Sequence, residues 1–212
     1  MVYKNTRLSV SNTMPTMHLK HEVVAMFLGV QVHVDHNVVK ENVRPTQVPG
    51  RVSSYSAAAD NHLAIMLPSE FHMLTFVVDN GNSVFVHTEL CADSLFLVQA
   101  QWRFIANVFG SDSVVHGLLY HDKANVPVLG IFDATRLRGV DLHTESLLER
   151  HMKIYTLMHE MPHPSIQYHW MGYAKHCHAN VRNPNNPFSA HQILVFGQDD
   201  NQRVLAGIDT SR

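Results

Sequence analysis

Short apolar runs separated by turn residues dominate the middle of the chain. LTFVV (74–78) and SVFVH (83–87) flank the dipeptide Asn80-Gly81. Asn and Gly tolerate positive φ angles, so this dipeptide between two β-branched and aromatic runs predicts a β-hairpin. SLFLVQ (94–99) is a further predicted strand of the same kind.

A second hairpin is predicted further along the chain. SVVHGLLY (113–120) and VPVLGIFDA (126–134) are apolar runs joined by the polar segment HDKAN (121–125). HQILVF (191–196) is predicted to be the last strand. These runs favour antiparallel pairing, because segments joined by short turns lie next to each other in a sheet.

The period of the apolar positions changes at residue 144. In TESLLERHMKIYTLM (144–158) the apolar residues recur at helical spacing on one face. They are Leu147, Leu148, Ile154, Tyr155 and Met158. Ser146 and Glu149 have the spacing of a capping box, which predicts the start of a helix. Pro162 and Pro164 predict its end, because proline lacks the backbone donor that a helix needs.

Segments rich in Pro, Gly, Asn and Asp predict loops between these elements. They are RPTQVPGRVSS (44–54), RNPNNPF (182–188) and the turn GQDDNQ (197–202). Several strands around one helix are typical of an α+β domain with an antiparallel sheet. Residues 1–45 show no clear period, so we expect an N-terminal extension there and one domain over residues 46–212.

The composition excludes some classes of function. Only 16% of the residues are charged and the formal net charge is −2, so no general attraction to nucleic acid is expected. No run approaches the ~20 apolar residues of a membrane helix. Two cysteines, Cys91 and Cys177, do not make a disulfide framework. We expect an intracellular protein, cytoplasmic or nuclear; the basic residues of segment 1–21 leave a mitochondrial location open.

HEMPHPSIQYH (159–169) has the spacing of a zinc-protease signature. The matching positions are His159, Glu160, His163 and His169. That chemistry needs its first two histidines on one helical face. Pro162 lies between them, and proline inside a helix costs ~3 kcal/mol. The β-branched Ile166 replaces a glycine that must turn sharply. We therefore interpret the segment as a helix end followed by a turn.

Other histidines give a weaker metal signal. The ligand types that lie close together are His33 and His36, and then His169, His176, Cys177 and His178. They lack the paired spacing of a structural zinc site. We interpret them as surface or core residues and expect no metal and no cofactor.

Five segments, taken in order, carry a resemblance to a known family. They are VPGRVSS (48–54), VVDNGN (77–82), NSVFVHTEL (82–90), the stretch 113–155 and PFSAHQILVFGQDD (187–200). Together they resemble mRNA guanylyltransferases, the capping enzymes of the covalent nucleotidyltransferase superfamily. The strongest part is 113–155, with its hairpin, its Phe132-Asp133 strand and its helix bearing Arg150. The resemblance implies an antiparallel-sheet nucleotidyltransferase-like domain, without the OB-fold that follows in the family.

The resemblance also implies a degenerate site. In the family, a lysine in a KxDGxR strand attacks the α-phosphate of GTP and forms a lysyl-nucleotide. Here the lysine position is Val77 and the arginine position is Asn82. The family's DGE motif aligns with His116, Gly117 and Leu118, and QILVF (192–196) lacks the acid of the DGLIF strand. We therefore expect no catalytic residue.

Four residues keep side chains that such a site uses, and the resemblance implies that they line a remnant nucleotide-binding cleft. They are Asp79, Phe132, Asp133 and Lys175. Phe132 would stack on a base; the alternatives are a core aromatic at Phe132 and an ordinary surface lysine at Lys175. We also expect Val77, His116, Phe132 and Gln192 to face one space between two sheets.

The expected function is that of a catalytically inactive binding or scaffold module in an RNA-processing or capping-related assembly. A protein partner is expected on the cleft face, and a nucleotide or an RNA 5′ end are further ligands in this interpretation. Two alternatives stay open. One is an active nucleotidyltransferase with misaligned motifs, for which Lys40 in KENVR is an out-of-order nucleophile. The other is the histidine-based zinc hydrolase.

Overall fold

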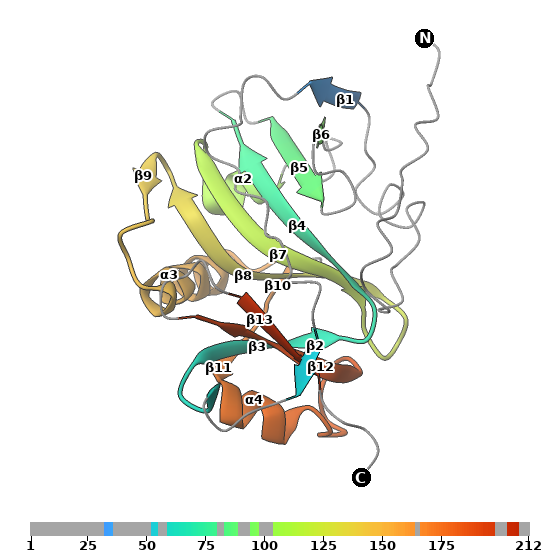
Figure 1. Ribbon diagram of the computed structural model, residues 1–212. Coiled ribbons are helices and arrows are strands. Elements are labelled where there is room, and N and C mark those ends of the chain that lie inside the picture. Colours follow the sequence, from blue (N-terminus) through green and yellow to red (C-terminus); the bar gives the residue numbers. More distant parts are fainter. Residues whose placement is uncertain are drawn as a thin grey trace.

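The computed structural model describes residues 59–79, 83–88, 104–163 and 166–197, together with the backbone of four further short strands. These residues form two β-sheets and three helices (Figure 1). The helices are α2 (Phe104–Phe109), α3 (Leu147–Glu160) and α4 (Ala174–Asn180). In Figure 1 the larger sheet occupies the upper part of the molecule, and the smaller sheet lies with α4 in the lower part.

The large sheet has eight strands. Some adjacent strands are consecutive in the sequence, and others come from distant parts of the chain. Along the sheet these are β1 (Val32–Asp35), β6 (Ser94–Leu97), β5 (Val84–Thr88), β4 (Phe71–Val78), β7 (Ser113–His121), β8 (Pro127–Leu137) and β10 (Ile166–Tyr168), with β9 (Val140–Asp141) on the end of β8. Every pairing is antiparallel except that of β10 with β8. Both predicted hairpins are confirmed, as β4–β5 and as β7–β8.

The small sheet has five strands. In order these are β11 (Met171–Tyr173), β3 (Leu63–Pro68), β12 (Ala190–Phe196), β13 (Arg203–Gly207) and β2 (Val52–Ser54). Two predictions are wrong here. Residues 52–54 are a strand instead of loop, and β12 is followed by another strand, β13. β2 pairs in parallel with β13, which comes from the far end of the chain. The sequence around residues 52–54 therefore gives no sign of this strand.

The described central strands of the large sheet are buried on both faces. Alternate residues of its central strands point to opposite sides, and they enter two separate apolar clusters. The outer cluster, which includes Phe76, Val115 and Ile131, also takes residues from α2 and α3. The inner cluster, which includes Met73 and Leu118, takes residues from the small sheet and α4. The order of layers is therefore helices, large sheet, small sheet and α4.

Helix α3 follows the predicted start and stop signals. Ser146 is the N-cap, and the capping box with Glu149 is present in both directions. The helix ends at Glu160, before Pro162. Within the part of the chain that the structure describes, no helix is long and apolar enough to cross a membrane.

One crossover joins the two sheets through His169, which lies between β10 and β11. Its backbone N–H donates to the carbonyl of Ile131 in the large sheet (2.8 Å), and its Nε2 donates to the carbonyl of Met66 in the small sheet (2.8 Å). Burial lowers the pKa of His169 to about 4. The ring is therefore neutral at pH 7, and it connects the sheets without burying a charge.

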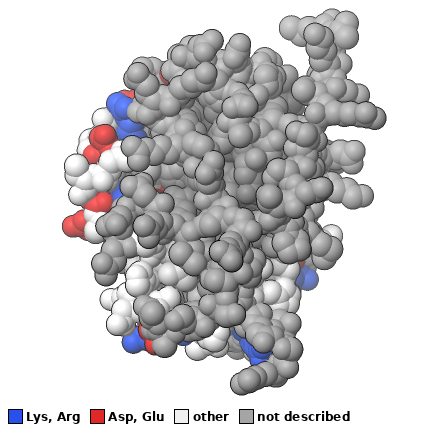
Figure 2. All heavy atoms as spheres, in the orientation of Figure 1, with Lys and Arg blue, Asp and Glu red and all other residues white. Residues whose placement is uncertain are grey.

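Strand β1 lies within residues 1–45, the predicted N-terminal extension, and it pairs with β6 at the edge of the large sheet. The large sheet therefore takes a strand from residues before 46. The boundary between extension and domain stays a prediction. Figure 2 shows one face of the molecule, on which the described acidic and basic side chains are interspersed.

Candidate functional site

A β-bulge in β8 organises the polar groups between the sheets. His116 of β7 pairs with Asp133, whereas the next residue, Gly117, pairs with Ile131. Phe132 is therefore an extra residue with no partner in the ladder. In a regular strand, Phe132 and Asp133 would point to opposite faces. The bulge interrupts this alternation, and the Phe132 carbonyl has its hydrogen-bond partner outside the sheet.

His151 of α3 supplies that partner. Its Nδ1 lies 2.7 Å from the Phe132 carbonyl oxygen, and its Nε2 accepts the backbone N–H of Met171 at 3.2 Å. The Tyr168 hydroxyl also bonds Nε2. Nδ1 must donate to the carbonyl and Nε2 must accept from Met171, which fixes one neutral tautomer. Burial lowers the pKa of His151, and this effect exceeds the opposing effects of the Phe132 carbonyl and of Asp133.

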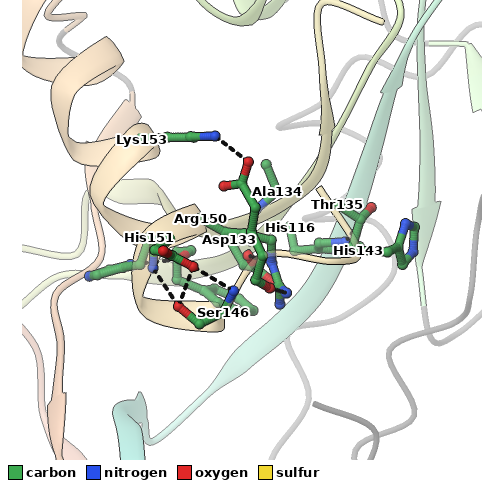
Figure 3. A network of polar contacts seen from close by, with 12 residues as sticks. His116, Asp133, Ala134, Thr135, His143, Ser146, Arg150, His151 and Lys153 are labelled. Carbon is green, nitrogen blue, oxygen red and sulfur yellow. Dashed lines mark hydrogen bonds and ion pairs between the residues drawn. The ribbon is translucent and has the colours of Figure 1, made fainter. Parts of the chain in front are cut away.

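Asp133 forms a two-point ion pair with Arg150 (Figure 3). Arg150 Nε and Nη2 donate to the two carboxylate oxygens at 2.9 and 3.0 Å, and the side chains are only 5% and 1% exposed. Asp133 also accepts the N–H of Ala134, and Arg150 Nη1 donates to the carbonyl of Glu145. Both ionic groups are thus paired with each other and hydrogen-bonded to further protein groups, as buried charges require.

His116 joins three strands on the inner face of the large sheet. Its Nδ1 lies 3.0 Å from the Thr75 hydroxyl of β4, and its Nε2 lies 3.4 Å from the Thr135 hydroxyl of β8. Thr75 and His116 are 2% and 3% exposed. We call His116, Asp133, Arg150 and His151, with the Phe132 carbonyl, the bulge network. Figure 3 shows these four side chains grouped between α3 and the strands.

The bulge network contains two of the four predicted nucleotide contacts. Phe132 is fully buried and its ring lies 6.1 Å from that of Phe196 on β12, so it packs between the sheets as a core aromatic. Asp133 is occupied by Arg150. A base or a metal could reach these two side chains only if the surrounding contacts opened. Their predicted contact with a nucleotide stays a prediction.

The other two predicted contacts lie elsewhere. Asp79 is exposed at the end of β4, where its N–H donates to the carbonyl of Ser83 across the hairpin. It is four residues from Thr75, or about 13 Å along an extended strand. Lys175 is exposed at the start of α4, under the small sheet. The structure therefore does not bring Asp79 and Lys175 to the bulge network.

Of the four positions expected to face one space, Val77, His116 and Phe132 belong to the large sheet and Gln192 belongs to the small sheet. Val77 has the same parity as Thr75 on β4, and Thr75 contacts His116. Gln192 has the same parity as Phe196 on β12, whose ring packs against Phe132. By strand alternation, all four positions are on the facing sides of the two sheets. Val77 and Gln192 are half-buried.

The zinc-protease pattern has no metal geometry. Its first histidine is on the last turn of α3, after which the helix stops. The ring of His163 stacks on Phe104 with centroids 3.7 Å apart, and His169 donates to Met66. The described residues contain no group of three or more His, Cys, Asp or Glu that could hold a metal ion. The predicted helix end is confirmed, whereas Ile166–Tyr168, predicted to belong to the turn, form strand β10.

The looser histidine and cysteine set is also dispersed. On α4, Cys177 is buried and its thiol donates to the Ala64 carbonyl at 3.3 Å, while His176 is exposed. Burial raises the pKa of Cys177 to about 11, which disfavours the thiolate that metals prefer. The side chains of His33 and His36 lie outside the described residues.

Sequence reasoning missed Thr75 and His151. The sequence marks each of them as a polar residue within an apolar pattern. Thr75 is the polar residue inside the apolar run LTFVV, and His151 is a polar residue beside Leu147 and Ile154 on the apolar face of the helix. Polar residues on a buried face need hydrogen-bond partners. That rule marks both residues as members of a network, although it does not name their partners.

Comparisons with known proteins bear on the fold. No protein-family model matches the chain, and no curated protein does. The chain is similar to the ligase domain of LigD from M. tuberculosis, with a TM-score of 0.54 and 14% identity, covering 74% of this chain and 56% of that one. It is also similar to a mycobacterial DNA ligase D complexed with ATP and MES, with a TM-score of 0.52 and 14% identity, covering 75% and 59%.

The chain thus spans well under two thirds of the length of both ligase structures. At 14% identity the likeness concerns the fold alone. It confirms the α+β, mainly antiparallel architecture that the capping-enzyme resemblance implied, and it assigns the chain to no family. The chain has a two-sheet fold of the ligase-like nucleotidyltransferase kind.

Proposed function

We propose that this chain is a nucleotidyltransferase-like domain that acts as a binding or scaffold module and forms no lysyl-nucleotide. Its ligands would be a nucleotide or an RNA 5′ end together with a protein partner, in an RNA-processing or capping-related assembly. The fold supports a nucleotide-binding domain; the assembly rests on the resemblance of residues 46–200.

The observation that carries the proposal is the placement of the lysines. Covalent transfer needs a lysine whose pKa is lowered by burial or by nearby cations. The lysines in the described ranges are Lys123, Lys153 and Lys175, and all three are exposed. Lys123 donates to the Pro184 carbonyl and Lys153 pairs with Glu145, so both lie at the surface in ordinary contacts.

The filling of the space between the sheets supports one part of the proposal, the absence of lysyl transfer. At the centre of the inner face, where polar ligand contacts would be needed, Thr75 and His116 bond each other and Asp133 bonds Arg150. Phe132 occupies the adjacent apolar volume. A buried polar group that is already paired gains little from a ligand and loses its partner when a ligand displaces it. This arrangement favours structural roles for these side chains.

The proposal is tested by incubating the chain with α-labelled GTP or ATP and Mg²⁺ or Mn²⁺. In lysyl transfer the amine attacks the α-phosphate, a P–N bond forms and pyrophosphate leaves. We expect no labelled protein under conditions in which a competent ligase domain is fully labelled. A labelled chain whose adduct is lost in acid and kept in alkali, as a phosphoramidate is, would refute the proposal.

Lysine variants test four of the six lysines of the chain as the source of any label. Lys123→Ala, Lys153→Ala and Lys175→Ala test the described lysines, and Lys40→Ala tests the out-of-order candidate. Loss of labelling in one variant only would establish an active nucleotidyltransferase with that residue as nucleophile. A heat-denatured sample controls for non-enzymatic attachment.

A further inference from the structure

Helix α3 carries an exposed apolar stripe. Leu148, Met152 and Tyr155 are 47%, 49% and 43% exposed. They are spaced four and three residues apart, so they lie on one side of the helix. His159 extends the same line by one turn, and its ring lies 5.9 Å from that of Tyr155. We call these four residues the α3 stripe.

The stripe is distinct from the face that α3 buries. The buried residues of the helix are Leu147, Arg150, His151 and Ile154. At 100° per residue, the stripe is centred about 110° around the helix from Leu147, on the side of His151. His151 contacts Tyr168 of β10, and the Tyr168 ring lies 5.1 Å from that of Tyr155. The stripe is therefore bordered by the edge of the large sheet on one side.

The other border of the stripe is charged. Glu149, Lys153 and Glu160 lie on the opposite flank of α3, and all three are exposed. Lys153 pairs with Glu145 just before the helix, which offsets its charge. Glu149 stays ionised because its hydrogen bonds with Ser146 lower its pKa. The flank therefore presents a net negative charge beside an apolar line.

We propose that the α3 stripe is a docking surface for an amphipathic helix of a protein partner that carries basic residues along one flank. The stripe spans twelve residues, from 148 to 159, and the eleven rises between its ends give about 16 Å of helix axis. A partner helix of about three turns matches this length. Its apolar face would cover Leu148, Met152 and Tyr155, and its Lys or Arg residues would face Glu149 and Glu160.

The charge pattern disfavours a second copy of this chain as the occupant. In a two-fold antiparallel pair of α3 helices, the N-terminal part of each lies beside the C-terminal part of the other. Glu149 of one copy would lie near Glu160 of the other, and the two Lys153 residues would meet near the centre. Like charges at such positions destabilise the pair. A basic partner removes both conflicts. This inference goes beyond the proposed function, because it holds whether or not the chain transfers nucleotides.

Two synthetic peptides test the proposal on the full chain. Both are amphipathic helices with leucine at helical spacing; one has lysines along a flank and the other has glutamates at the same positions. We expect the lysine peptide to bind saturably and to slow amide exchange over 148–159. The glutamate peptide should bind at least tenfold more weakly. Absence of binding by the lysine peptide, or equal binding of both, would overturn the proposal.

Matched variants locate the site. Leu148→Gln with Met152→Gln removes apolar area while keeping a good helix former. We expect affinity for the lysine peptide to fall at least tenfold, because each buried apolar side chain contributes roughly tenfold in affinity. Val126→Gln, at an apolar residue of similar exposure (52%) in the turn between β7 and β8, should change affinity less than about twofold. Unchanged affinity in the double variant would refute the site. A dimer that sedimentation shows to depend on Leu148 and Met152 would refute the choice of partner.

Discussion

The ion pair between Arg150 and Asp133 gives the sharpest stability prediction. Arg150→Met keeps an unbranched apolar chain in place of the aliphatic part of Arg150, but it leaves the Asp133 carboxylate buried at 1% exposure with only the Ala134 N–H as a remaining donor. Two charge-assisted bonds of 2.9 and 3.0 Å are lost. Removal of one partner from a buried pair costs about 3–5 kcal/mol. We expect that loss in the free energy of unfolding, measured by urea denaturation at pH 7.

The double variant separates the ion pair from the packing of Arg150. Asp133→Asn removes the charge and retains an oxygen that can accept from Ala134. If the penalty of Arg150→Met comes from an uncompensated charge, Arg150→Met with Asp133→Asn should be more stable than Arg150→Met alone. A cost of less than about 1 kcal/mol for Arg150→Met, or no recovery in the double variant, would refute the reasoning.

Three further perturbations test other parts of the structure. The pKa of His169 is lowered to about 4 in the fold, so the unfolded chain binds a proton more readily as the pH falls. The free energy of unfolding should therefore fall by about 3 kcal/mol between pH 6.5 and pH 4. Urea denaturation at several pH values measures this fall, and the dependence on pH should be weaker in His169→Gln. Ser146→Ala removes the capping box of α3 and should cost ~1 kcal/mol in thermal or urea unfolding, whereas the exposed neighbour Thr144→Ala should stay within ~0.5 kcal/mol. Gly117→Ala would put a Cβ 2.8 Å from the Gly130 carbonyl oxygen and should cost about 1–3 kcal/mol by overpacking; a neutral effect would contradict the close approach of β7 and β8.

The elements that could be predicted from sequence are those with local signals. The β4–β5 hairpin has Asn80-Gly81 between two β-branched runs, and α3 has a capping box at Ser146. In both cases the residues that specify the element lie within it or next to it. Such signals survive tertiary packing, because the fold and the local preference agree.

The elements that were missed depend on distant partners. β10 and β11 have three residues each, and they are strands only because β8 and β3 supply their hydrogen bonds. β3 (LAIMLP) is a continuous apolar run without alternation, which sequence alone cannot separate from a buried helical segment. α4 has seven residues, below the length at which a helix is stable by itself.

The candidate site was predicted only in part, because some of its contacts join residues that are distant in the sequence. Phe132 and Asp133 were singled out from the order of motifs, and they do lie between the sheets with His116. The bulge at Phe132 has no local sign, since it arises from the register of β7 against β8. Consequently the pairing of Asp133 with Arg150, seventeen residues away, and the role of His151 could not be derived from the sequence.

The central claim is that a nucleotidyltransferase-like fold is present here without lysyl transfer. Intact-mass spectrometry after incubation of the chain with each of the four ribonucleoside triphosphates, with Mg²⁺ and with Mn²⁺, tests it most directly. The account predicts only the mass of the unmodified chain in every sample, while a competent ligase domain treated in parallel gains one nucleoside monophosphate. A stoichiometric gain of that mass on this chain, mapped to a lysine, would contradict the account.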